Sequence, residues 1–107
     1  MIEWTEQATQ QLDAAHDYIS LSNGEDIAVR ITSRIVSSVL QLDAFPISGR
    51  PGRVPGTREL VISKTPFIAV YGMEKSRIVI LAIYHAAQRW PESFSESAFS
   101  TQPRILV

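Results

Sequence analysis

The chain has 107 residues, of which 45% are hydrophobic and 20% charged, and a formal net charge of −1. This size and composition predict one folded domain with a single hydrophobic core and exclude a disordered chain. The absence of cysteine excludes disulfides, thiolate metal sites and a cysteine nucleophile. The longest apolar run, residues 78–84, is too short to span a bilayer, and the first residues lack the pattern of a secretion signal. We therefore expect a cytoplasmic protein with no membrane partner.

The net charge hides an asymmetry along the chain. Residues 1–46 contain seven acids and two bases, a net charge of −5, whereas residues 47–91 contain seven bases and two acids, a net charge of +5. We expect an electrically polar molecule whose basic part attracts an anionic partner.

The first half of the chain predicts a short strand followed by two helices. Residues 1–4 suit a strand, and Thr5 suits the N-cap of a helix whose apolar side chains recur every three or four residues. Residues 22–24, Ser-Asn-Gly, predict a tight turn, after which the same periodicity continues to Phe45-Pro46. Two helices joined in this way are expected to form an antiparallel hairpin.

The second half predicts a basic loop and three strands. Residues 45–56 contain three prolines and three glycines, which is typical of a loop. Residues 58–62, 67–71 and 77–84 are rich in β-branched and aromatic side chains and predict consecutive antiparallel strands. The last of them is apolar on both faces, which predicts a central place in the sheet with cover on each side.

The predicted fold is therefore α+β, in the order β-α-α-β-β-β, with the helical hairpin packed on a small antiparallel sheet. We assign residues 1–91 to this domain. The serine-rich residues 92–107 show little periodicity and are expected to form a tail that is mobile when the chain is alone.

No familiar catalytic or phosphate-binding motif is present, and we expect neither a metal nor a cofactor. Arg50, Arg53 and Arg58 lie in or beside the basic loop, where their guanidiniums suit phosphate or carboxylate binding. For Arg58 and Glu59, a solvated ion-pair network is an equally weighted interpretation.

Two further segments carry candidate groups. His85 ends the last predicted strand, where functional groups are commonly displayed, although a capped strand end explains it equally well. Trp90 suits base stacking, but we weigh packing over the edge of the core more heavily. His16 has no second ligand nearby and is interpreted as a surface or boundary residue. The candidate catalytic residues are Arg58, Glu59, His85 and Arg89, and the candidate target- or anion-binding residues are Arg50, Arg53, Arg58, Arg89 and Trp90.

Three segments, taken in order, resemble the RelE/ParE superfamily of toxins. They are FPISGRPGRVPGTREL at 45–60, PFIAVY at 66–71 and VILAIYHAAQRWP at 79–91, and the resemblance covers residues 2–91. It implies the toxin of a type II toxin–antitoxin module, also called a plasmid-stabilisation module. Such a toxin inhibits growth until a cognate antitoxin wraps it in a toxin–antitoxin hetero-oligomer.

The resemblance leaves the target open. RelE-like members cleave messenger RNA in the ribosome with basic residues and an acid–base pair, and Arg58 and His85 match two of those positions. Ile68 and Ala86 stand where such nucleases keep an arginine and, in one group, a tyrosine. The sequence is closer to ParE-like members, which inhibit DNA gyrase by binding. Gyrase inhibition is the preferred prediction, with a ribosome-dependent ribonuclease and a nontoxic binding module as alternatives, so the chain is not assigned as an enzyme.

Overall fold

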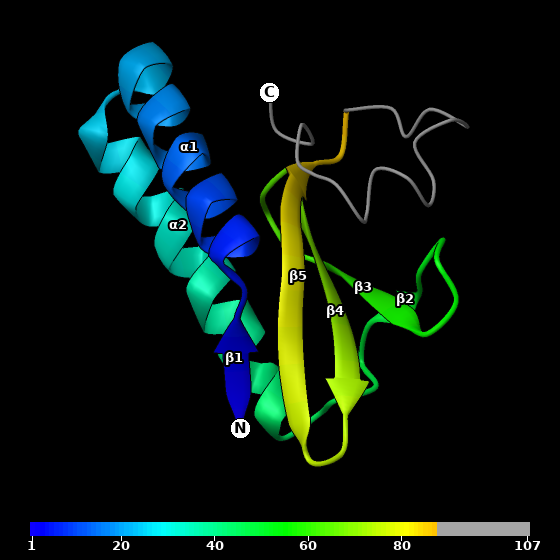
Figure 1. Ribbon diagram of the computed structural model, residues 1–107. Helices are drawn as coiled ribbons and strands as arrows, with labels where there is room; N and C mark the ends of the chain where they lie inside the picture. Colours follow the sequence, from blue (N-terminus) through cyan, green and yellow to red (C-terminus); the bar gives the residue numbers. More distant parts are fainter. Residues whose placement is uncertain (88–107) are drawn as a thin grey trace.

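The computed structural model describes residues 1–87 of the chain. Two helices form one layer and a five-stranded sheet forms the other (Figure 1). The helices are α1 (Glu6–Asn23) and α2 (Glu25–Leu40), and the strands, in the sheet order β1-β5-β4-β3-β2, are β1 (Ile2–Trp4), β5 (Arg77–His85), β4 (Phe67–Glu74), β3 (Thr57–Val61) and β2 (Arg50–Pro51). The predicted α+β fold with a helical hairpin on a sheet is confirmed. Within residues 1–87, neither helix is long and apolar enough to cross a membrane.

The sheet is mixed, whereas a purely antiparallel sheet was predicted. β3, β4 and β5 are antiparallel neighbours as expected, but β1 pairs with β5 in parallel, with Ile2 opposite Ile78. The chain leaves β1 through helices, and such a crossover permits parallel pairing, which a tight turn does not. The loop prediction for residues 45–56 also missed β2, whose two residues pair with β3.

Local signals set the helix boundaries with one exception. The hydroxyl of Thr5 accepts a hydrogen bond from the Ala8 amide and donates one to the Ile80 carbonyl, both at 3.0 Å, so the N-cap also fastens α1 to β5. Gly24, with a φ of 102°, separates the two helices as predicted. α2 ends at Leu40, earlier than predicted, because the chain continues as the 3-10 turn η1 (Gln41–Asp43). Leu42 of this turn is fully buried and continues the apolar spacing of α2, which is why the sequence pattern did not reveal the end of the helix.

The main core lies between the helices and one face of the sheet, and a second buried cluster is formed by Ile68, Val70, Ala82 and Tyr84. The predicted central place of the last strand is confirmed, because β5 lies between β1 and β4 and contributes to both clusters.

A β-bulge in β5 decides which of its side chains face the helices. Val70 pairs with Ala82 but the next residue, Tyr71, pairs with Ile80, so Leu81 is an extra residue on β5. The helix-facing series Ile78 and Ile80 therefore continues at Ile83, and Ala82 belongs to the other face. The bulge also turns His85 toward the helix side of the sheet.

Candidate functional site

The basic loop is anchored to the sheet by the buried hydroxyl of Tyr71 in β4. This hydroxyl accepts a hydrogen bond from the Gly49 amide at 3.0 Å and donates one to the Pro46 carbonyl at 2.8 Å. A Cβ atom on Gly49 would lie 2.8 Å from both the Tyr71 ring and the Glu59 carbonyl oxygen, so the loop backbone can approach this closely only at a glycine. The anchor determines where the neighbouring arginines lie.

Arg50 and Glu59 form an ion pair across β2 and β3. Nε and Nη2 of Arg50 donate to the same carboxylate oxygen of Glu59, at 3.1 and 2.9 Å. The Glu59 side chain is only 5% exposed, whereas that of Arg50 is 56% exposed. Because a buried carboxylate is destabilising without a cationic partner, this ion pair holds β2 on the sheet. It also engages the side chain of Glu59, one of the candidate catalytic residues, in a structural contact.

Arg58 uses two of its nitrogens to hold the loop. Its Nε donates to the Gly49 carbonyl at 3.1 Å and its Nη2 to the Ile47 carbonyl at 3.4 Å. Both acceptors are neutral, so these contacts orient the guanidinium without cancelling its charge. Glu59, the next residue along β3, points to the opposite face of the sheet. Arg53 is exposed in the same loop.

His85 is held at the end of β5 by a hydrogen bond to its ring and by one ring–ring contact. Its Nδ1 accepts a hydrogen bond from the Ala87 amide at 3.0 Å, and the ring packs edge-to-face on Phe67 with centroids 5.3 Å apart. Because Nδ1 is an acceptor, the neutral ring carries its proton on Nε2.

Arg58 and His85 lie far apart in the sheet. His85 pairs with Phe67 at the beginning of β4, whereas Arg58 pairs with Tyr71, four residues further along that strand. The standard rise of a strand and the spacing between strands put the two backbones about 16 Å apart. Arg89 and Trp90, the remaining candidates, lie outside the described residues.

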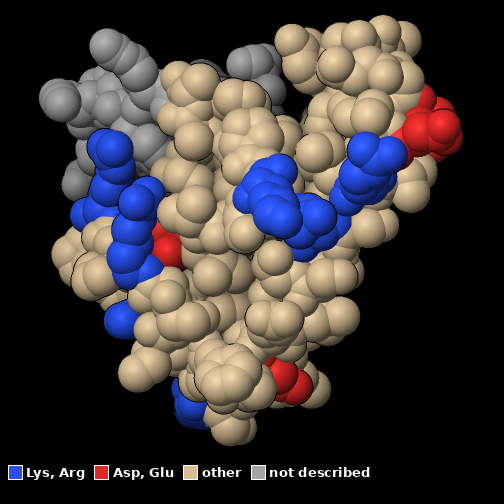
Figure 2. All heavy atoms as spheres, turned by 180° about the vertical axis from the view of Figure 1, so that it is seen from behind, with Lys and Arg blue, Asp and Glu red and all other residues tan. Residues whose placement is uncertain are grey.

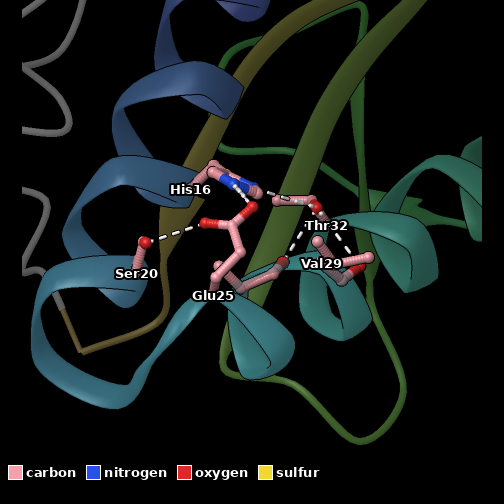
Figure 3. A network of polar contacts seen from close by, with 6 residues as sticks. His16, Ser20, Glu25, Val29 and Thr32 are labelled. Carbon is pink, nitrogen blue, oxygen red and sulfur yellow. Dashed lines mark hydrogen bonds and ion pairs between the residues drawn. The ribbon is translucent and has the colours of Figure 1, made fainter.

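A polar network that sequence reasoning missed joins the two helices (Figure 3). His16, interpreted only as a boundary residue, contacts Glu25 through Nε2 at 3.1 Å and Thr32 through Nδ1 at 3.4 Å, and Ser20 donates to Glu25 at 2.8 Å. The hydrogen bonds from Ser20 and His16 hold the pKa of the Glu25 carboxyl below its ordinary value of 4.5. The spacing of Ser20 and Glu25 across the turn was the signal available in the sequence.

A groove of about 440 Å³ lies between the helices next to this network, lined from α1 by Leu12, Asp13 and His16 and from α2 by Thr32, Ser33, Val36 and Ser37. Among residues 1–87, no three histidine or acidic side chains gather in a way that would hold a metal ion.

Comparison with known proteins identifies the family. The model of the family described as the ParE toxin of the type II toxin–antitoxin system parDE matches residues 2–90. A protein of Sinorhizobium fredii named "Putative toxin Y4kP" is 41% identical over 91 residues, which cover 85% of this chain and 93% of the relative. A chain in the structure of the chromosomal ParDE system from P. aeruginosa superimposes with a TM-score of 0.73 at 34% identity, covering 78% of this chain and 92% of that one. This protein therefore belongs to the ParE toxin family and is the toxin of a type II toxin–antitoxin system.

Proposed function

We propose that this toxin arrests growth by binding DNA gyrase in the cytoplasm and blocking its activity, and that a cognate antitoxin wraps the toxin in a hetero-oligomer and reverses the inhibition. Arg53, Arg58, Arg89 and Trp90 are the proposed target contacts. Arg50 acts mainly on the fold, because its guanidinium pairs with the buried Glu59.

The observation that supports binding over cleavage is the burial of Ile68, which occupies the position of a nuclease arginine. Its side chain is 5% exposed and packs in a buried cluster. A ribonuclease must bring proton-transfer groups and phosphate-binding cations within reach of one scissile bond. An apolar side chain at this position supplies no such cation.

A supercoiling assay with purified gyrase tests the proposal. Increasing toxin should inhibit supercoiling, and the antitoxin should restore it. His85→Ala should change this inhibition little, as should the matched control His16→Ala, because neither ring is among the proposed target contacts. In a ribonuclease that uses His85 for proton transfer, the same substitution should reduce cleavage by roughly 10²–10⁴-fold.

Two outcomes would replace the proposal. Efficient cleavage of ribosome-bound messenger RNA that His85→Ala abolishes, with supercoiling untouched, would make the protein a RelE-like ribonuclease. Normal bacterial growth during confirmed expression of the soluble chain would make it a nontoxic binding module.

A further inference from the structure

The two arginines of α2 have surroundings unlike those of the loop arginines. Arg30 and Arg34 are exposed, and neither makes a hydrogen bond or an ion pair within residues 1–87. Because they are four residues apart on a helix, their side chains leave α2 on the same side, one turn from each other. Two unpartnered guanidiniums thus stand next to each other at the surface.

The same side of α2 and the turn after it carry further polar side chains. Ser33, Ser37 and Gln41 are exposed and continue the spacing of three or four residues, opposite the buried Ile35 and Val39. We call Arg30, Ser33, Arg34, Ser37 and Gln41 the arginine stripe. Arginine, serine and glutamine side chains are common donors to phosphate oxygens in protein–DNA complexes. The acids of α2, Glu25 and Asp26, are confined to its first turn. Asp26 lies four residues before Arg30 and therefore on the same side of the helix, although no ion pair joins the two side chains.

A second basic group lies on the same face of the molecule. Figure 2 shows Lys and Arg side chains over the helical layer and over the side of the sheet that carries β2 and β3, with mostly uncharged surface between these two groups and a smaller basic area at the lower end of the molecule. The only basic residues in the helical layer are Arg30 and Arg34, and those from β2 to β3 are Arg50, Arg53 and Arg58. Arg58 contributes a full charge because its contacts are to neutral carbonyls. The face therefore presents positive charge at two separate places.

We propose that this face binds the sugar–phosphate backbone of duplex DNA through the arginine stripe. The inference rests on the proposed function, because gyrase acts on duplex DNA and a toxin bound to it lies beside that DNA. Phosphate contacts would hold the toxin on the enzyme–DNA complex. With a net charge of −1 for the whole chain, binding by the toxin alone should be weak and strongly dependent on salt.

An acidic protein segment is the other class of partner with the right charge, but the stripe suits it less well. Protein interfaces obtain most of their energy from aromatic, aliphatic or arginine side chains buried in pockets. The stripe has no aromatic or aliphatic member. The exposed Val36 of α2 lines the groove between the helices together with Ser33 and Ser37, so one edge of the stripe borders that groove.

Fluorescence anisotropy with the purified full chain and a labelled DNA duplex of about 30 base pairs tests the proposal over about 50–200 mM salt. Arg30→Gln/Arg34→Gln should weaken binding by about 10- to 100-fold near 0.1 M salt. It should also lower the slope of log K against log salt by about 2, since each lost phosphate contact removes about 0.9 released counterion. Arg30→Lys/Arg34→Lys should keep most of the slope, because the two charges remain.

The matched control is Lys64→Gln/Lys75→Gln, which removes the same two charges from the exposed turns that flank β4. It should change DNA affinity by less than about 2-fold, because those lysines lie outside the stripe. Circular dichroism and melting curves verify that every variant is folded. An equal loss in both double variants would refute the site, because net charge alone would then explain the binding.

Competition identifies the partner class. If poly-L-glutamate competes with the labelled duplex as well as unlabelled DNA of equal charge does, the proposal is overturned in favour of an acidic protein. If the chain binds single-stranded RNA more tightly than duplex DNA, the proposal is overturned in favour of RNA. Inhibition of supercoiling by a chain that binds no duplex DNA at about 50 mM salt would refute the DNA contact and leave the proposed function intact. DNA binding without inhibition of gyrase would refute the proposed function alone.

Discussion

The arginines of the β2–β3 region and those of α2 carry the same charge but differ in what they contact. Arg50 and Arg58 donate to a buried carboxylate and to loop carbonyls, so they hold the chain in place. Arg30 and Arg34 contact no partner within residues 1–87. The charge counted along a sequence is therefore not the charge available at the surface. The basic segment uses part of its charge for folding, whereas the acidic segment exposes both of its arginines.

The largest effect on the β2–β3 region is expected from removal of the anchor of the basic loop. Tyr71→Phe leaves the amide of Gly49 and the carbonyl of Pro46 without their partner, and should lower the free energy of unfolding by about 2–3 kcal/mol. Urea denaturation measures the change. Tyr18→Phe, at a side chain exposed on α1, is the matched control and should leave stability unchanged. Similar values for the two variants would show that the anchor does not stabilise the loop.

A smaller effect separates the two kinds of arginine directly. Arg50→Ala leaves the Glu59 carboxylate buried without its cation and should lower the free energy of unfolding by about 1–2 kcal/mol, a value reduced because Arg50 is half exposed. Arg50→Ala/Glu59→Gln should recover part of that loss. Arg34→Ala removes an equal charge with no partner and should cost less than about 0.5 kcal/mol. Equal costs for Arg50→Ala and Arg34→Ala would contradict the distinction between the two regions.

The smallest effect concerns an acid of the helical layer that, like Arg50, is used for folding. Ser20 and His16 lower the pKa of the Glu25 carboxyl in the folded state. The ionised carboxylate therefore contributes to stability above pH 4.5, and this contribution is lost as the pH falls through the lower pKa of the folded state. Glu25→Gln should therefore be less stable than the wild type at pH 7, and the difference should shrink below pH 4.5.

Chemical denaturation at a series of pH values measures this difference. Ser20→Ala removes the largest cause of the lowered pKa and should flatten the pH dependence. A difference between Glu25→Gln and the wild type that stays constant from pH 7 to below 4.5 would show that the network does not stabilise the ionised carboxylate.

The features that depend on neighbouring residues were predictable from the sequence alone. The cap at Thr5, the turn at Gly24, the apolar period of the helices and the three antiparallel strands follow from backbone preferences and local spacing. The motifs within residues 45–91 were also sufficient to indicate the superfamily, and the family model matches residues 2–90, nearly the range over which the resemblance was drawn. The position of the arginines in a basic loop was predictable, but their partners were not.

The features that join distant residues depend on the tertiary fold and were not predictable from the sequence. The Tyr71 hydroxyl meets the loop 22 and 25 residues away along the chain, and its place inside an apolar strand was the one sign that it needed a polar partner. The parallel pairing of β1 depends on a crossover through both helices. The bulge at Leu81 sets the side on which His85 lies. Side chains alternate between the two faces of a strand, so a shift of one residue, invisible in hydrophobic composition, reverses the face of every residue after it.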